Sequence, residues 1–545
     1  MPDNLIERTP SAYSYPLLIK NLLYAPVVDA PEQEIVYRDL LRFSYSELRQ
    51  RICRLANALT KLGVQPGDTV AVMDWDSHRY LECFFAVPMI GAVLHTVNVR
   101  LPPEQIVYTI DHAEDDFIFV NSEFLPILEQ IKGRITAVKG FILLTDETDQ
   151  QEPTLPLAGE YESLLASSST EFDFPDFDEN TRATTFYTTG TTGMPKGVYF
   201  SHRQLVLHTF GALAALGTPT IQGRFHQQDV YMPITPMFHV HAWGLPYIAT
   251  TLGVKQVYPG KYAPATLLQL IDTEGVTFSH CVPTIMHMLM STPEFSDTDL
   301  SRWKVIIGGA ALPRKMCKTA LAKGIDIFTG YGMSETCPVL TLAHTGNEEL
   351  DEEAEIERRC KTGRPLPLVE LKVVDEKMEE IKPDGEQVGE IVVRAPWLTQ
   401  GYLKDRNNSE NLWLGGYLHT GDVANMDHDS YVSITDRMKD VIKVGGEWLS
   451  SLELEDVINQ HPAVAEVAVI GMDDPKWGER PLALVMLKEG SGQLDEKELV
   501  DHVRDFIDKG ILTRLALRLN IRMVDIIEKT SVGKIDKKLL RKKHL

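Results

Sequence analysis

The stretch Tyr187-Thr-Thr-Gly-Thr-Thr-Gly-Met-Pro-Lys196-Gly197 is the most informative part of the chain. Its glycines let backbone N–H groups approach an anion closely, its threonine hydroxyls add donors, and Lys196 adds positive charge. It is not a Walker A loop, because Pro195 stands where that motif needs glycine and Gly197 where it needs serine or threonine. The alternative is a flexible polar turn between strands. The density of glycine and threonine favours a phosphate-binding loop.

Helical and strand patterns alternate on both sides of this loop. Tyr45 to Leu62 has apolar residues at helical spacing and stops at Gly63, whereas Thr69 to Met73 has the pattern of a short buried strand. A helix is expected around Tyr80 to Ile90. Further strand patterns occur at Ala92 to Val97, Asp116 to Val120, Lys255 to Tyr258, Thr277 to Val282 and Lys304 to Ile307. Such alternation predicts an α/β fold with largely parallel sheets.

The pattern changes from about Val369. Glu370 to Val374 and Gly389 to Arg394 have the pattern of strands with no long helix between them, which predicts a smaller antiparallel or barrel-like unit. A further βα pattern follows Arg437. It predicts helices at Ser451 to Asn459 and Leu494 to Asp508 and a strand at Val464 to Met472. We therefore expect two domains, spanning residues 1–436 and 437–545.

Two other segments carry polar groups that suit a nucleotide. Gly330-Tyr-Gly-Met-Ser-Glu-Thr336 departs from the dinucleotide fingerprint, because Glu335 takes the place of its third glycine. A carboxylate beside glycines and hydroxyls suits a magnesium ion near phosphates. In His419-Thr-Gly-Asp422, the aspartate is suited to accept both hydroxyls of a ribose. Taken alone, the first segment is about as consistent with an ordinary turn, and a segment like the second is usually only a turn.

Two charged segments lie nearer the C-terminus. Asp436-Arg-Met-Lys-Asp-Val-Ile-Lys-Val-Gly-Gly-Glu-Trp448 surrounds a strand and a Gly-Gly turn at the expected domain boundary. An interdomain linker with salt bridges is the simpler interpretation of that segment. In Glu528-Lys-Thr-Ser-Val-Gly-Lys-Ile-Asp-Lys537, Lys534 follows a glycine outside any helical pattern. Its own spacing does not distinguish it from a surface lysine.

The overall composition narrows the classes of partner. The 545 residues are 43% hydrophobic and 24% charged, and the formal net charge is -23. Such an acidic surface repels nucleic acid, so we expect no nucleic-acid partner. The six cysteines are scattered singly, which is typical of reduced thiols. No stretch has the pattern of a signal peptide or membrane span, so we expect no transmembrane segment and a cytoplasmic enzyme.

In this order, the five segments resemble those of the adenylate-forming superfamily, which contains acyl-CoA synthetases, luciferases and peptide-synthetase adenylation domains. The resemblance runs from about residue 20 to 540. It implies a large N-terminal domain, with two α/β subdomains and a distorted β-barrel, and a small mobile α+β C-terminal domain. It also implies two half-reactions. A carboxylate attacks the α-phosphate of ATP, and a thiol, usually that of coenzyme A, then displaces AMP.

The resemblance assigns roles to individual residues. Lys534 reaches the α-phosphate and the substrate carboxylate, Lys439 is the hinge between domain orientations, and Thr188 and Glu335 hold Mg²⁺. Asp422 binds the ribose hydroxyls. The other residues implied to bind ATP or coenzyme A are Thr189, Gly190, Thr191, Thr192, Gly193, Lys196, Gly309, Gly330, Tyr331, Ser334, Arg437, Lys443, Gly445, Gly446 and Trp448.

The acid is predicted from three pocket positions. His239 stands where peptide-synthetase domains place an aspartate, which disfavours an amino acid. Trp243 resembles the gate residue of bacterial long-chain synthetases. Gly332 replaces the tryptophan of acetyl-CoA synthetases, and we expect it to leave room for a longer chain. His239 and His241 have the H-x-H spacing of a metal site, but no third ligand is evident and a pocket wall is favoured.

The predicted function is therefore an AMP-forming ligase that joins a medium- or long-chain fatty acid to coenzyme A. A bacterial relative that uses 3-methylmercaptopropionate shares the His–Trp pattern, so that thioether acid and aryl acids remain alternatives. An adenylating enzyme with a non-CoA acceptor and a catalytically silent binding protein are further alternatives. The presence of Glu335, Asp422 and Lys534 together argues against the silent protein. The resemblance also implies a homodimer formed through the N-terminal domain.

Overall fold

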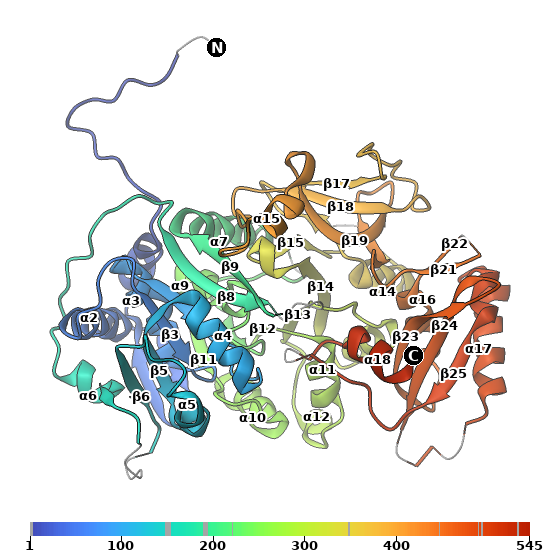
Figure 1. The fold of residues 1–545 in the computed structure, drawn as a ribbon, viewed down its shortest axis with the longest axis horizontal. Helices are drawn as coiled ribbons and strands as arrows, with labels where there is room; N and C mark the ends of the chain where they lie inside the picture. Colours follow the sequence, from blue (N-terminus) through green and yellow to red (C-terminus); the bar gives the residue numbers. More distant parts are fainter. Residues whose placement is uncertain are drawn as a thin grey trace.

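The computed structural model describes residues 4–147, 154–188, 194–220, 222–346, 349–445, 447–488, 490–491, 494–530 and 533–545. Within these residues the chain forms four β-sheets flanked by helices (Figure 1). The two larger sheets alternate with helices along the sequence, and the two smaller ones follow after residue 369. The predicted α/β architecture is confirmed.

The first sheet has seven strands in the order β7-β6-β5-β3-β4-β8-β9, and only the β8–β9 pair is antiparallel. Its strands are β3 (Thr69–Met73), β4 (Val93–Thr96), β5 (Asp115–Asn121), β6 (Gly140–Leu144), β7 (Leu157–Glu160), β8 (Arg182–Thr188) and β9 (Lys196–Ser201). The helices of this half are η1 (Ile19–Leu23), α1 (Tyr24–Asp29), α2 (Tyr45–Lys61), α3 (His78–Met89), α4 (Pro103–Ala113), η2 (Ser122–Phe124), α5 (Leu125–Ile131), α6 (Tyr161–Ala166) and α7 (His202–Gly217).

The second sheet has nine strands in the order β16-β15-β14-β13-β12-β10-β11-β1-β2, and its central strands are parallel. Its strands are β1 (Glu34–Tyr37), β2 (Leu41–Ser44), β10 (Val230–Pro233), β11 (Lys255–Tyr258), β12 (Phe278–Cys281), β13 (Lys304–Ile307), β14 (Asp326–Gly332), β15 (Val339–Leu342) and β16 (Arg364–Pro365). The associated helices are α8 (Val240–Trp243), α9 (Leu245–Leu252), α10 (Pro264–Glu274), α11 (Pro283–Met290), α12 (Glu294–Asp297), α13 (Arg314–Ala322), η3 (Ser334–Thr336) and α14 (Glu352–Cys360).

The third sheet is antiparallel and has the order β17-β18-β19-β20. It comprises β17 (Glu370–Val374), β18 (Gly389–Arg394), β19 (Leu418–Met426) and β20 (Val432–Arg437), with α15 (Arg406–Leu412) and η4 (Leu414–Gly416) between β18 and β19. The predicted change to antiparallel strands after Val369 is therefore confirmed. The sheet covers the upper side of the molecule in Figure 1, above the centre of the second sheet.

The C-terminal part folds around a fourth sheet, which lies at the right of Figure 1. It contains β21 (Ile442–Val444), β22 (Glu447–Leu449), β23 (Val464–Asp474), β24 (Gly478–Leu487) and β25 (Asn520–Met523), with helices α16 (Ser451–Asn459), α17 (Glu496–Asp508), η5 (Arg514–Arg518) and α18 (Lys537–His544). Apolar residues of these elements form their own buried core, including Ile442, Leu454, Val469 and Val485. A separate core is the property expected of an independent domain. The precise boundary at 436/437 stays a prediction.

Helix α2 shows how the sequence sets an element. Ser44 and Glu47 form a reciprocal capping box at its N-terminus. Its buried face carries Leu48, Ile52, Leu55, Ala56 and Leu59, spaced as one side of a helix requires. Gly63 follows with φ +93°, a left-handed conformation that glycine adopts without steric cost. The helix therefore ends where the sequence predicts.

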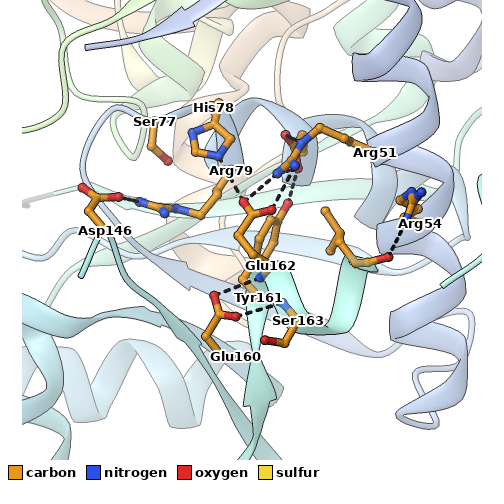
Figure 2. A network of polar contacts seen from close by, with 12 residues as sticks. Arg51, Arg54, Ser77, His78, Arg79, Asp146, Glu160, Tyr161, Glu162 and Ser163 are labelled. Carbon is orange, nitrogen blue, oxygen red and sulfur yellow. Dashed lines mark hydrogen bonds and ion pairs between the residues drawn. The ribbon is translucent and has the colours of Figure 1, made fainter. Parts of the chain in front are cut away.

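A partly buried polar network joins α2, α3 and α6 (Figure 2). The guanidinium of Arg51 contacts Glu82 and Glu162, each at 2.7 Å. Glu82 has no exposed side-chain surface and also accepts a hydrogen bond from the Tyr161 hydroxyl at 2.5 Å. Nε2 of His78, which lies on α3, is 3.3 Å from Oε1 of Glu162. Because all of these residues belong to α2, α3 and α6, the network stabilises the packing of these three helices.

Candidate active site

Two of the predicted site residues, Gly309 and Gly330, lie at the carboxyl ends of parallel strands of the second sheet. Gly308 and Gly309 follow β13, Thr284 follows β12, and Gly330 lies near the end of β14. Ligands of open α/β sheets bind outside the carboxyl ends of their strands, so this is the expected edge. Gly330 lies close to Ile306 of the adjacent strand β13, since a Cβ built on Gly330 would be 2.7 Å from Ile306 Cγ2.

Lys534 comes to this edge from the C-terminal domain. A Cβ built on Gly309 would lie 2.9 Å from Lys534 Cε, so the lysine side chain passes directly over that glycine. The hydroxyl of Thr284 donates to the carbonyl oxygen of Gly533 at 3.1 Å and fixes the chain just before the lysine. Two residues of the N-terminal domain thus hold the loop that carries Lys534.

The electrostatic surroundings of Lys534 favour loss of its proton. Burial lowers the pKa of Lys534 to about 8, and the positive charge of Arg437 acts in the same direction. Asp422 and Glu335 oppose this shift. Lys534, Arg437, Asp422 and Glu335 therefore lie near enough to act on one another as a cluster. A bound anion beside Lys534 would raise this pKa again.

Asp422 lies on β19 opposite Arg437 on β20. Asp422 is 5% exposed, and its two carboxylate oxygens have different partners. Tyr331 donates its hydroxyl to Oδ2 at 2.8 Å, and Nε of Arg437 lies 3.1 Å from Oδ1. The tyrosine and the arginine hold this carboxylate in a defined orientation. The structure thus brings together three residues that the sequence predicted in separate segments.

Glu335 lies in η3, next to Ser334, and is 8% exposed. The Tyr402 hydroxyl donates to Glu335 Oε1 at 2.7 Å. The ring of the same tyrosine lies under Lys196, with 4.5 Å between Nζ and the ring centroid. The sequence analysis missed Tyr402. A single tyrosine in the connection between β18 and α15 gives no local signal, and its position is evident only from the fold.

The phosphate loop is described only at its ends. Thr188 ends β8 and Lys196 begins β9, and the two residues face each other across the hairpin. The Thr188 hydroxyl points to the Lys196 carbonyl oxygen at 3.5 Å. The predicted phosphate ligands Thr189, Gly190, Thr191, Thr192 and Gly193 lie outside the described residues. The assignment of these residues to phosphate binding stays a prediction.

The donors near this hairpin suit a hard cation. Among the described residues, no group of three or more His, Cys, Asp or Glu side chains could hold a metal ion. Glu335 uses Oε1 for Tyr402, and Thr188 offers a hydroxyl. Mg²⁺ commonly binds through one or two protein oxygens together with substrate phosphates, so this small oxygen donor set fits it.

The segment predicted to face a thiol is placed differently from Lys534. The backbone N–H of Lys443 donates to Glu479 at 2.7 Å, and that of Gly445 donates to the Trp477 carbonyl at 2.6 Å. Both partners belong to the C-terminal domain. Lys439 lies on the exposed turn after β20. Gly446 and the side chain of Trp448 are outside what the structure describes.

The predicted acyl-pocket wall has an unusual backbone. All four residues of α8 have positive φ, between +47° and +59°, so this short turn is left-handed. Such conformations are costly for residues with side chains and cluster at functional sites. Trp243 is 6% exposed and packs on His280, with 5.0 Å between ring centroids. Its indole lies against Gly308, where a built Cβ would be 2.9 Å from Cη2.

Two histidines precede Trp243. His239 is half-buried, and burial lowers its pKa to about 3, with Lys534 and Arg100 acting in the same direction. His241 is fully buried among Phe84, Phe186 and Tyr247, and burial likewise lowers its pKa to about 3. Both rings are therefore neutral at physiological pH. His239 is also near enough to Lys534 for the two side chains to interact electrostatically.

Gly332 requires a correction. The sequence interpretation was that its missing side chain leaves room for a longer acid. A Cβ at Gly332 would lie 1.7 Å from the Pro338 carbonyl oxygen, so the backbone of a neighbouring segment fills that space. Glycine is needed here for close backbone approach. The argument for chain length from this position therefore fails, although Gly332 stays a predicted pocket residue.

Comparison with known proteins agrees with this geometry. The family model described as AMP-binding enzyme matches residues 26–403, and the model of the AMP-binding enzyme C-terminal domain matches residues 453–534. The chain belongs to the AMP-binding enzyme family. The resemblance to the adenylate-forming superfamily is thereby confirmed.

Several relatives of this AMP-binding enzyme are similar over nearly their whole length. A long-chain-fatty-acid–CoA ligase of Thermus thermophilus is 39% identical, with 94% of this chain and 93% of the relative covered. A 3-methylmercaptopropionyl-CoA ligase of Ruegeria lacuscaerulensis is also 39% identical, with coverage of 96% and 97%. A medium-chain-fatty-acid–CoA ligase of Ectopseudomonas oleovorans is 35% identical, with coverage of 93% and 91%.

Solved structures share the fold of this AMP-binding enzyme. The anthranilate CoA ligase AuaEII, in complex with anthranoyl-AMP, superposes with a TM-score of 0.84 at 24% identity, over 97% of this chain and 98% of that one. ATP-bound MatB from Rhodopseudomonas palustris gives a TM-score of 0.82 at 24% identity, with coverage of 97% and 99%. The predicted arrangement of a large N-terminal and a small C-terminal domain is therefore confirmed.

Two general expectations can also be compared with the structure. All six cysteines are free thiols, as their scattered positions predict. Among the described residues, none of the helices combines the length and the apolar character needed to cross a bilayer.

Proposed function

We propose that this enzyme is an AMP-forming ligase that activates a medium- or long-chain fatty acid with ATP and transfers the acyl group to coenzyme A. The observation that carries the proposal is the assembly of Lys534, Asp422, Arg437 and Glu335 at one sheet edge, although two domains supply them. The printed activities of the full-length relatives support the same reaction.

In the first half-reaction, a carboxylate oxygen of the acid attacks the α-phosphorus of ATP, and the bond to pyrophosphate breaks. Both reactants are anions, so the site must neutralise charge and align them. Lys534 would contact the α-phosphate and the entering carboxylate. Asp422 would accept the ribose hydroxyls while Tyr331 and Arg437 hold it in place. Lys196 and the hairpin would bind the β- and γ-phosphates.

We further propose that Mg²⁺ accompanies ATP, with Glu335 and Thr188 as its protein ligands. The ion would supply positive charge to the triphosphate. Tyr402 holds one oxygen of Glu335, which orients the carboxylate for such a role.

In the second half-reaction, the sulfur of coenzyme A attacks the acyl carbonyl carbon, the bond to AMP breaks, and the thiol proton leaves to solvent. The small domain would first turn about Lys439 and exchange Lys534 for the segment with Lys443, Gly445, Gly446 and Trp448. Gly309 and Gly330 would line the adenine site throughout. The present placement of Lys534 supports assignment of this arrangement to adenylation.

The acid is proposed from the pocket wall and the relatives. His239 is neutral, so the wall offers no fixed charge at that position to pair with an ammonium group. Trp243 closes the space beside Gly308 with a large apolar ring. A fatty acid suits such a wall. The second candidate is 3-methylmercaptopropionate, because one relative of equal identity carries that printed activity.

A panel of acids tests this assignment. Acetate, 3-methylmercaptopropionate, benzoate, octanoate and palmitate would be compared by AMP release with ATP and coenzyme A. We expect the highest kcat/KM for octanoate or palmitate. Preference for acetate would overturn the pocket assignment, whereas preference for the thioether acid would select the second candidate.

A homodimer and a cytoplasmic location also remain proposals. The N-terminal arm extends away from the body in Figure 1 and exposes Leu5, Ile6, Tyr13 and Tyr15. An exposed apolar arm supports contact with a second copy. Sedimentation equilibrium would test the dimer.

A further inference from the structure

Tyr402 joins two parts of the candidate nucleotide site that are far apart in sequence. Its hydroxyl donates to Glu335 Oε1 at 2.7 Å, and its ring centroid lies 4.5 Å from Lys196 Nζ. Glu335 belongs to the segment after β14, whereas Lys196 closes the phosphate hairpin. One side chain therefore contacts both the predicted metal ligand and the predicted phosphate ligand.

The backbone around Tyr402 is fixed to the same two segments. The N–H of Leu403 donates to the Gly197 carbonyl at 2.8 Å, directly after Lys196. The N–H of Thr399 donates to the carbonyl of Glu335 at 3.0 Å. Ser409 Oγ accepts the N–H of Tyr402 at 2.8 Å. The ring and the hydroxyl thus have little freedom to move away from their partners.

The Tyr402 hydroxyl is the donor in its contact with the Glu335 carboxylate. A neutral phenol that donates to a carboxylate makes a charge-assisted hydrogen bond, which is stronger than a bond between neutral groups. Glu335 is therefore oriented before any ligand arrives.

We propose that Tyr402 is a positioning residue that couples the metal ligand Glu335 to the phosphate ligand Lys196. Its hydroxyl occupies Oε1 of Glu335 and leaves Oε2 for the cation that accompanies ATP. Its ring lies against the Lys196 ammonium in a cation–π contact, which limits where that charge can move. This inference rests on the proposed function, because it assigns Glu335 and Lys196 to the metal and the triphosphate.

Binding of ATP without acid or coenzyme A tests the proposal. Isothermal titration calorimetry with ATP would be run in Mg²⁺ and, separately, in EDTA, on wild type, Tyr402→Phe and Tyr402→Leu. We expect Tyr402→Phe to weaken binding about tenfold in Mg²⁺ and to leave binding in EDTA unchanged, since only the bond to a charged group is lost. Tyr402→Leu also loses the ring, so it should weaken binding in both conditions.

Tyr331→Phe is the matched control. It removes another tyrosine-to-carboxylate hydrogen bond of nearly equal length, 2.8 Å, but at Asp422. We expect it to weaken ATP binding by the same factor in Mg²⁺ and in EDTA. The EDTA measurement also shows that each variant still folds and binds nucleotide.

Two results would overturn the proposal. One is a Tyr402→Phe enzyme with unchanged affinity in Mg²⁺, and the other is an equal loss with and without Mg²⁺, which indicates a structural role alone. Failure of the proposed function is distinguishable. A wild-type enzyme that binds Mg²⁺–ATP but releases no pyrophosphate with any acid would refute the ligase reaction and leave the binding result intact.

Discussion

At the scale of single residues, Lys534 carries the account. It is delivered by a loop of the small domain, but its surroundings belong to the large one. Its position over Gly309 and its electrostatic coupling to Asp422 and Glu335 support the role proposed for it in the attack on the α-phosphate. The role proposed for Lys534 in adenylation can be tested separately from thioester formation.

We predict that Lys534→Ala lowers the rate of adenylation at least about 100-fold, which is the usual effect of removing one preorganised charge or donor. Conversion of a chemically prepared acyl-adenylate to the thioester should survive, because in the proposed mechanism Lys534 has left the site before that step. Pyrophosphate release and thioester formation would be measured separately. Equal losses in both half-reactions would contradict the assigned role.

The pKa of Lys534 gives a pH dependence with a defined sign. The lysine is protonated below about pH 8 and loses its charge as the pH rises through that value. We predict that kcat/KM for adenylation falls above pH 8. The fall in kcat at saturating ATP should occur at higher pH, because bound phosphate favours the charged amine.

Lys534→Arg provides the control for this profile, since a guanidinium stays protonated throughout the range. Whatever activity the arginine enzyme retains should show no fall between pH 8 and 9.5. A wild-type kcat/KM that is flat over the same interval would refute the assignment of this ionisation to Lys534.

At the scale of elements, the packing of α2, α3 and α6 depends on the network in Figure 2. We predict that Arg51→Met destabilises the protein by about 3–5 kcal/mol, because it leaves the carboxylate of Glu82 buried and unpaired. Thermal unfolding would measure the change. Arg134→Met is the matched control, since Arg134 pairs with Glu104 in solvent and its loss should barely move the midpoint.

The regular elements were predictable because local chemistry decides them. Helix α2 ends within one residue of its predicted bounds, and strands β11 and β13 appear at the predicted residues. The left-handed turn at Val240 to Trp243 was not predictable, because its residues have no left-handed preference and only tertiary packing holds them there. Gly332 was misinterpreted for a related reason. Its neighbour, Pro338, approaches through the fold and not through the local sequence.

In the candidate site, too, some residues could be predicted from the sequence and others could not. The motifs identified Lys534, Asp422, Arg437 and Glu335, because each lies in a segment with a recognisable order of glycines and polar residues. Tyr402 was missed, although it contacts two of the predicted segments. Its contribution comes from the packing of the connection between β18 and α15 against β9, which no short sequence pattern encodes.

At the scale of the whole molecule, the account requires the small domain to change its orientation between half-reactions. Thr284 and Gly533 mark the contact that must open, since a Cβ on Gly533 would lie 3.0 Å from Thr284 Oγ1. We predict that a Thr284→Cys/Gly533→Cys enzyme, once oxidised, still forms acyl-adenylate but no longer forms thioester. Reductant should restore the second step.

The controls for this crosslink are the oxidised wild type and the reduced double variant. Most native cysteines are buried, so oxidation alone should have little effect. Gly533 has φ +83°, so a cysteine at this position adds backbone strain. The activity of the reduced double variant shows the effect of that strain without the crosslink. Thioester formation by the crosslinked enzyme at the wild-type rate would exclude the rotation.

The central claim is that this AMP-binding enzyme adenylates a fatty acid and passes it to coenzyme A. The most direct measurement is AMP release from ATP and octanoate, with and without coenzyme A. Without coenzyme A, the account predicts slow AMP release, limited by acyl-adenylate that stays bound. With coenzyme A, it predicts sustained turnover with octanoyl-CoA as product. Pyrophosphate release that never responds to coenzyme A, with no thioester formed, would contradict it.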